Sequence, residues 1–364
     1  ALAVLVARPD PLDAYVCDHP DFLLAEGIGA TVLHPDNPVV LAPHLAAAAQ
    51  ELPLTPADSV WFGDSVTSLA DRLTAQGLLR RRAAGWFWTR PQRAVDSIDL
   101  RSSGSTSVGV VEERTGRVVG HVDVAAADRT VHDGAVYLHQ GEQWLIGDYD
   151  QAAQVALARQ VRTGYYTQPQ SVGDARIVRR DSERPLGVGR LALGMVELTS
   201  QVTGYLRRDE VTGDVWDSTP LELPTRHLVT QSVWWTLDRA ALAASGVAQA
   251  DLAGAAHAAE HTAIGLLPMF APCDRWDIGG RSTVLHPDTG ELTVFVHDGF
   301  PGGAGFAAKG YQFAERWLAT TLDRLAECPC ESGCPRCIVS PKCGNGNNPL
   351  HKAGALALLT QLVG

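Results

Sequence analysis

The stretch Cys328-Pro-Cys330-Glu-Ser-Gly-Cys334-Pro-Arg-Cys337, followed by Cys343, decides how the C-terminal end of this 364-residue chain folds. Five of the seven cysteines lie in it. Small secreted proteins space their cysteines along the whole sequence as disulfide staples, whereas one dense group in a large chain with no secretory signal is typical of a metal site. The sequence therefore predicts a metal centre near the C-terminus.

Zinc fits this spacing because it takes four ligands in a tetrahedron, usually as close pairs across tight turns. Cys334-x-x-Cys337 has the spacing of a zinc knuckle, and Gly333 and Pro335 are turn residues. Closing the shortest loop costs the least chain entropy. Four thiolates would leave no open position for water, so we expect a closed, structural site. The expected ligands are Cys328, Cys330, Cys334 and Cys337, with Cys343 as a substitute.

Helices are expected on both sides of the cysteine stretch. Their apolar residues recur at helical spacing in four segments: Arg239 to Ala244, Ala248 to Leu267, Phe306 to Glu327 and Leu350 to Val363. The glycines between His297 and Gly305 are interpreted as turn positions, because no phosphate-binding lysine accompanies them. We expect residues 239–364 to form a helical zinc-binding domain.

The run from Cys328 to Asn347 (CPCESGCPRCIVSPKCGNGN) resembles the C-terminal zinc-binding domain of the mitomycin repair factor A family, which are superfamily-two DNA helicases. The mycobacterial and actinobacterial members look closest. Three further stretches are similar to the same family: GAVYLHQG at 134–141, CDRWDIGG at 273–280 and HDGFPGGAG at 297–305. The resemblance implies an ATP-driven helicase that moves 3′ to 5′ on single-stranded DNA, or on DNA with a 3′ tail, and acts in DNA repair. It also implies that residues 1–36 end a second RecA-like motor lobe, and that the chain works in the bacterial cytoplasm at the nucleoid.

Residues 37–96 have the outline of a winged helix. Helical spacing in 45–52 and 65–76 is followed by two short strands, 78–82 and 86–89, around an Ala-Ala-Gly turn. From Arg72 to Arg93 there are six arginines and no acidic residue, which indicates either a solvated basic face or a wing that contacts DNA. The candidate DNA-binding residues are Arg80, Arg81, Arg82, Trp86, Trp88, Arg90 and Arg93, the two tryptophans as platforms for unpaired bases.

Short alternating segments separated by turns predict a β-rich domain over residues 97–238. Tyr137, His139 and Trp144 are its weaker candidates for stacking on bases, while core packing is expected for Trp234 and Trp235. At the N-terminus we expect strands at Ala1–Val6 and Ala30–Leu33 with a helix between them. The fold class predicted for the whole chain is α+β and multidomain.

The formal charge of −11 argues against a generally basic surface but not against a local basic stripe that binds nucleic acid. No run of apolar residues is long enough to predict a membrane span. The chain has only three lysines, and none lies in a G-x-x-x-x-G-K-[ST] loop. We therefore expect ATP and Mg²⁺ to bind only in motor lobes outside this sequence, at the N-terminal side of the same protein, and the chain alone to lack ATPase activity.

One enzymatic alternative stays open. His257-Ala-Ala-Glu260-His261 matches the H-x-x-E-H pattern of zinc peptidases, in which two histidines on one helix face bind zinc and the glutamate acts as base. Such an enzyme also needs an acidic ligand, for which Asp274 or Asp277 would serve. A weaker hydrolytic alternative would use His297, Asp298 and Asp277. The pattern is short enough to arise by chance on an interior helix.

Overall fold

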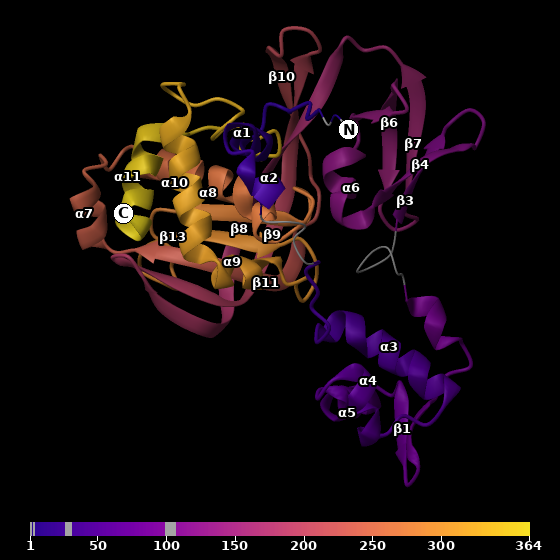
Figure 1. The fold of residues 1–364 in the computed structure, drawn as a ribbon. Helices are drawn as coiled ribbons and strands as arrows, with labels where there is room; N and C mark the ends of the chain where they lie inside the picture. The colour runs from indigo at the N-terminus through magenta and orange to yellow at the C-terminus, as the bar shows by residue number, and fades with distance from the viewer. Residues whose placement is uncertain (1, 3, 26–30, 99–106) are drawn as a thin grey trace. The chain divides into compact units, whose positions relative to one another are not determined.

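The computed structural model describes residues 2, 4–25, 31–98 and 107–364, and it confirms an α+β, multidomain chain. The chain forms two compact units. The larger unit contains residues 1–97, 175–198 and 228–364, and the smaller unit contains residues 98–174 and 199–227. Each is described separately below (Figure 1).

The winged-helix part of the larger unit forms as its apolar spacing predicts. Its elements are α3 (Pro38–Glu51), the 3-10 turn η1 (Pro56–Asp58), α4 (Ser59–Phe62), α5 (Val66–Ala75), β1 (Leu79–Arg82), β2 (Gly85–Trp88) and η2 (Ala94–Ser97). Leu54 exchanges two backbone hydrogen bonds with Trp86, an isolated bridge that ties the segment after α3 to the hairpin. Gly85 is required there: it has a φ of +131°, and a Cβ would lie 2.3 Å from the Leu54 carbonyl oxygen.

The cysteine stretch belongs to a region in which helices pack on a β-sheet. The sheet runs in the order β10-β9-β11-β13-β12, with β8 also pairing with β9. The strands of its central part are β9 (Gly189–Asp209), β11 (Arg226–Leu237), β13 (Leu292–Asp298) and β12 (Ile278–Thr283). Trp235 packs edge-on against Trp317 of the helical layer, whereas Trp234 packs against Phe295 in a separate buried cluster. Both tryptophans are buried, as expected, because the sheet is covered on both faces at this point.

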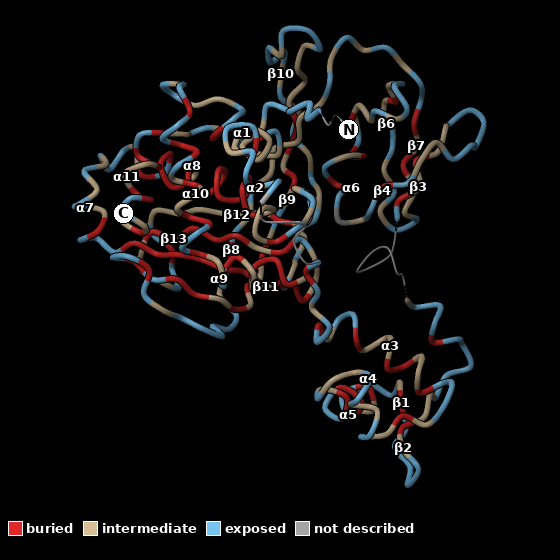
Figure 2. The backbone as a smooth tube through the Cα atoms, viewed as in Figure 1, coloured by how far each residue is buried: buried red, intermediate tan, exposed pale blue. Residues whose placement is uncertain are grey.

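The helices of this region surround one buried helix. The elements are α7 (Arg239–Ser245), α8 (Leu252–Leu266), η3 (Leu267–Met269), α9 (Phe306–Gln312), α10 (Ala314–Glu327) and α11 (Lys352–Val363). Most side chains of α8 are buried, and Figure 2 shows this concentration of buried residues. A helix that is apolar on all sides must lie inside the protein, and α8 accordingly packs against α10, α11, β12 and β13.

The N-terminal segment differs from the expectation. The helix α1 (Pro11–Asp18) forms and is capped by Asp10, whose carboxylate accepts a hydrogen bond from the Asp13 amide, and α2 (Asp21–Ala25) follows. Neither expected strand forms at the described residues; Ala1, Ala3 and Ala30 lie outside them. An apolar run becomes a strand only beside a hydrogen-bonding neighbour, and Leu2, Val4 and Val6 are largely exposed. Pro11 packs instead against Gly265 of α8.

The smaller unit contains a five-stranded sheet in the order β4-β3-β7-β6-β5. Its elements are β3 (Ser107–Glu112), β4 (Val118–Asp123), α6 (Val124–Thr130), β5 (Val136–His139), β6 (Glu142–Asp150) and β7 (Val155–Val161). Parts of β8 (Tyr165–Leu186) and β9, and all of β10 (Val215–Pro220), belong to it as well. Alternating residues of β3 and β7 fill its core, as period-2 patterning predicts.

The expected domain limits at 97–238 and 239–364 differ from these units. Residues 175–198 and 228–237 group with the C-terminal region because β11 pairs with β13 over six positions, from Ser232↔His297 to Leu237↔Leu292. The zinc-binding region is therefore helices on a sheet, and the β-rich segment contributes strands to both units.

Candidate metal centre and nucleic-acid interface

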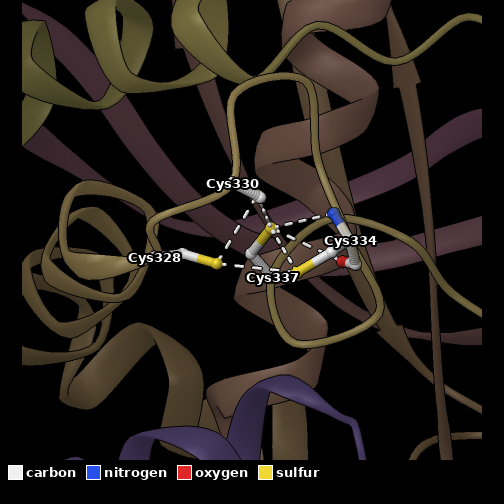
Figure 3. Close-up of side chains that lie close together, drawn as sticks. All are labelled: Cys328, Cys330, Cys334 and Cys337. Atoms are coloured by element: carbon white, nitrogen blue, oxygen red, sulfur yellow. Dashed lines mark hydrogen bonds between the residues drawn. The ribbon is translucent and has the colours of Figure 1, made fainter.

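Four cysteine sulfurs converge at the end of α10, all within 4.8 Å of one another (Figure 3). The Sγ–Sγ distances are 3.5 Å for Cys328–Cys330, 3.6 Å for Cys328–Cys334, 3.5 Å for Cys330–Cys337 and 3.8 Å for Cys334–Cys337. These are too long for disulfides, which need about 2.05 Å. A tetrahedron of thiolates at about 2.3 Å from zinc has edges of about 3.8 Å. The four side chains therefore fit a zinc ion in a closed site.

The backbone around the cysteines holds this geometry. The Cys334 amide donates to the Cys337 sulfur at 3.3 Å, the close contact of a knuckle turn. Gly333 has a φ of +120°, and a Cβ there would lie 2.3 Å from Ile338 Cδ1. Burial raises the pKa of the Cys337 thiol, so its thiolate form needs a positive charge nearby to be stable at this depth.

Lys352 was not recognised from the sequence as part of this centre. It is buried, and its ammonium donates to the carbonyl oxygens of Cys328 and Cys330 at 2.6 Å each and lies 3.6 Å from Cys330 Sγ. Four thiolates around Zn²⁺ carry a net charge of −2, which this cation partly offsets. The available signal was its position nine residues after Cys343, in a chain with only three lysines.

Cys343 does not lie with the four cysteines, so its expected role as substitute ligand is not supported. Asn347 hydrogen-bonds Ser340 through both its carbonyl oxygen and its amide, which closes a turn that directs Cys343 toward α8. There Cys343 Sγ lies 3.4 Å from His257 Nε2. Its donor atom and those of His257 and His261 lie within 4.8 Å of one another.

Neighbouring imidazoles change the titration of this thiol. Burial opposes ionisation, but hydrogen bonds from His257 and His261 lower the pKa of Cys343 to about 5. For His257 burial acts in the opposite direction, yet the contact with Cys343 raises its pKa.

The arginines of the hairpin β1–β2, hereafter the basic hairpin (Leu79–Trp88), are divided between two faces. Arg81 is opposite Trp86 in the register, and directly opposed residues share a face. Arg81 lies over the Trp86 ring, 5.0 Å from its centroid, and 3.5 Å from Asp71. Arg80 and Arg82 are on the opposite, solvent-exposed face. All three arginines are exposed, but Arg81 is engaged by Trp86 and Asp71, so Arg80 and Arg82 form the arginine face of the hairpin.

Comparison with known proteins identifies the chain's relatives. The family model "MrfA Zn-binding domain" matches residues 259–338, and "ATP-dependent helicase HRQ1, winged helix domain" matches residues 33–103. The "Uncharacterized ATP-dependent helicase YprA" of Bacillus subtilis is 27% identical over 343 residues, which is 93% of this chain and 45% of that protein. The chain thus contains one region similar to the MrfA zinc-binding domain and one similar to the HRQ1 winged-helix domain, and its relatives are named as ATP-dependent helicases.

Two further similar proteins are also named as helicases. "ATP-dependent helicase HRQ1" of Saccharomyces cerevisiae is 24% identical over 389 residues, covering 100% of this chain and 35% of that protein. A crystal structure of "DUF1998 helicase MrfA bound to DNA" superposes with a TM-score of 0.59 at 25% identity, over 96% of this chain and 46% of that one. The chain thus spans less than half the length of these helicases.

Two of the expected base-stacking platforms lie in hydrophobic cores. Trp86 is 1% exposed and donates its indole N–H to Asp71, and Trp144 is 4% exposed in the core of the smaller unit. Trp88 is half-buried and donates to the Gln92 carbonyl. Tyr137 and His139 stack on each other, with ring centroids 5.8 Å apart. Trp86 and Trp144 therefore pack in hydrophobic cores and are not available to stack on bases, contrary to the expectation from sequence.

The peptidase alternative loses its expected acidic ligand. His257 and His261 do share one face of α8, but their third neighbour among the described residues is Cys343. Asp274 and Asp277 bond within their own turn, the Asp277 carboxylate accepting from the Asp274 amide at 2.7 Å. Glu260 lies against Gly280, where a Cβ would approach its Oε1 to 2.9 Å.

Asp298 has a structural role that replaces the weaker hydrolytic alternative. It is fully buried, and its carboxylate accepts hydrogen bonds from the amides of Ala304, Gly305 and Ala307 at 2.6–2.8 Å. It thereby fixes the glycine-rich loop at the start of α9, where Gly302, Gly303 and Gly305 have positive φ as expected of turn positions. Burial lowers the pKa of His297 to about 4, so this imidazole stays neutral.

Proposed function

We propose that this chain is the DNA-binding accessory half of an ATP-dependent 3′-to-5′ DNA helicase that acts in DNA repair. One observation carries the proposal: a winged helix of the HRQ1 type presents exposed arginines, in a chain whose fold matches that of MrfA crystallised with DNA. The relatives are ATP-dependent helicases, and the same assignment for this chain follows by similarity.

The basic hairpin would contact the phosphate backbone. Arg80 and Arg82 lie on its solvent face, and the exposed Arg90 and Arg93 follow it in the chain. Arginine suits this contact because its planar guanidinium binds phosphate in a fork. Such contacts carry no sequence preference and fix the position of the strand. The DNA proposed is single-stranded or carries a 3′ tail.

The ATP-hydrolysing motor is proposed to be supplied by N-terminal lobes of the same protein, of which residues 1–36 would form the end. ATP and Mg²⁺ would bind there, because no phosphate-binding loop occurs in these 364 residues. The zinc centre is proposed to be structural, since four thiolates leave no position for a reacting water molecule. We also propose that the protein acts in the cytoplasm, at the nucleoid. No helix in the described part of the chain is long and apolar enough to span a membrane.

The experiment is a binding titration of the whole chain with a fluorescent 3′-tailed DNA at several salt concentrations. Removing both guanidinium groups by Arg80→Ala and Arg82→Ala should weaken binding and flatten the plot of log affinity against log salt. Each lost phosphate contact should change the slope by about 0.7–0.9. DNA-stimulated ATP hydrolysis should stay at the level of a blank.

Two matched variants control for charge and for folding. Arg114→Ala with Arg117→Ala removes the same charge from a turn of the smaller unit, where both arginines pair with Glu112, and should leave the slope unchanged. Arg81→Ala, on the core-facing side of the hairpin, should change the slope less than Arg80→Ala. Equal slopes in the parent and the Arg80/Arg82 double variant would show that this face is only solvated.

A further inference from the structure

We propose that His257, His261 and Cys343 bind a second metal ion, zinc by its ligand chemistry, separate from the tetracysteine centre. The two histidines are one turn apart on α8, and Cys343 comes from the loop that follows the cysteine stretch. His261 is buried, while His257 and Cys343 are half-buried. Their three donor atoms lie within 4.8 Å of one another. Positions His257 and Cys343 lie outside the residues matched by the zinc-binding family model.

The donor set and its spacing match zinc. Imidazole nitrogen and thiolate sulfur are the ligands zinc prefers, at about 2.0–2.1 Å and 2.3 Å respectively. In a tetrahedron these bond lengths place a nitrogen and a sulfur about 3.6 Å apart. His257 Nε2 and Cys343 Sγ are separated by 3.4 Å. A metal ion therefore fits between them with little movement of either side chain.

The hydrogen bonds of the two imidazoles expose the correct nitrogens. His257 Nδ1 lies 2.8 Å from the Pro349 carbonyl oxygen, and His261 Nδ1 lies 2.7 Å from that of Ile338. A carbonyl can only accept, so Nδ1 carries a proton in each ring, and Nε2 is the nitrogen left available to a metal ion. Metal-bound histidines are typically oriented in this way, by donating the other ring N–H to an oxygen.

The position of the cluster gives the second ion a structural task. The carbonyls that accept from the histidines belong to Ile338 and Pro349, which flank the turn that carries Cys343. The loop 338–349 is already held to α8 at its two ends by these hydrogen bonds. An ion bound by all three side chains would also attach the middle of the loop, at Cys343, to α8. Three protein ligands leave a fourth position for water or another donor. The proposal does not depend on DNA binding or on helicase activity.

The first test is the zinc content of the purified full chain after dialysis, measured by elemental mass spectrometry with protein concentration from amino-acid analysis. We expect two zinc ions per parent chain. Cys343→Ser and His257→Gln should each retain one, because the tetracysteine ligands are untouched. The matched control Cys17→Ser, at an exposed cysteine, should retain two. One zinc per chain in the parent and in all three variants would overturn the proposal.

A second measurement protects the test against variants that fold poorly. Anomalous diffraction at the zinc edge from crystals of the parent should give two peaks, one inside the tetracysteine group and one between α8 and Cys343. A single peak at the tetracysteine group, with Cys343 left as a metal-free partner of His257, would reject the second site without any substitution.

Discussion

The sequence singled out both the cysteine loop (Cys328–Cys337) and the basic hairpin as functional sites. In the structure, all the predicted residues of the first lie at one site, whereas those of the second are divided between two faces. All four cysteines point to one centre. In the hairpin, Trp86 is buried in the winged-helix core, Arg81 lies over its ring on the same face but stays exposed, and Arg80 and Arg82 lie on the opposite face. Metal ligands close in sequence are constrained by the stereochemistry of the ion, so spacing alone identifies them. The faces of a short hairpin are decided by what packs against it, which spacing does not reveal.

The largest effect is expected from removing a metal ligand. Cys337→Ser should release the tetracysteine zinc and loosen the fold around α10 and α11, because metal binding free energy is folding free energy at a structural site. We expect a loss of several kcal/mol of stability, bounded by the roughly 10–16 kcal/mol that zinc contributes to zinc-finger peptides. Thermal unfolding and zinc content of Cys337→Ser measure this, with Cys17→Ser as the control. A parent-like melting temperature together with loss of zinc would mean that the ion does not support the fold.

The sequence predicted local features well because they depend on local rules. The winged-helix elements, the buried helix with His257 and His261, and the cysteine ligands all follow from periodicity and spacing. The sequence did not predict contacts between residues that are far apart in the chain. Cys343 lies beside a histidine 86 positions earlier in the chain. Strand β11, which the sequence places in the β-rich domain, pairs with β13 of the C-terminal region. Trp86 and Trp88 share one strand face, and only the packing of α5 on that face shows it to be the core side.

A second test asks whether the hairpin tryptophans are as unequal as their burial indicates. Trp86→Ala should cost about 3–5 kcal/mol, the usual loss for a fully buried large aromatic residue, because it leaves a cavity among Leu54, Leu69 and Leu79. Trp88→Ala, at a half-buried position, should cost about 1–2 kcal/mol. Hydrogen exchange of peptides from α3 to β2 localises the effect, while zinc content should stay at the parent value in both variants. Equal protection of those peptides in the two variants would show that the two tryptophans support the winged helix equally despite their different burial.

The smallest effect should come from Lys352, the residue that spacing did not reveal. Its ammonium is buried and bonds two carbonyl oxygens of the cysteine loop, so it both positions the loop and offsets the charge of four thiolates. Residues that support metal ligands in this way usually contribute 10- to 100-fold to metal affinity. Lys352→Met keeps the length of the side chain and removes the charge, so we expect affinity for the tetracysteine zinc to fall by about that factor, with full occupancy restored in excess zinc.

Competition with a chromophoric chelator measures this affinity. Lys309→Met is the matched control, because the Lys309 ammonium bonds Gln312 rather than the cysteine loop. If Lys352→Met and Lys309→Met lose zinc at the same chelator concentration, Lys352 does not contribute to zinc affinity. The geometry of the site would then depend on the spacing of the four cysteines alone.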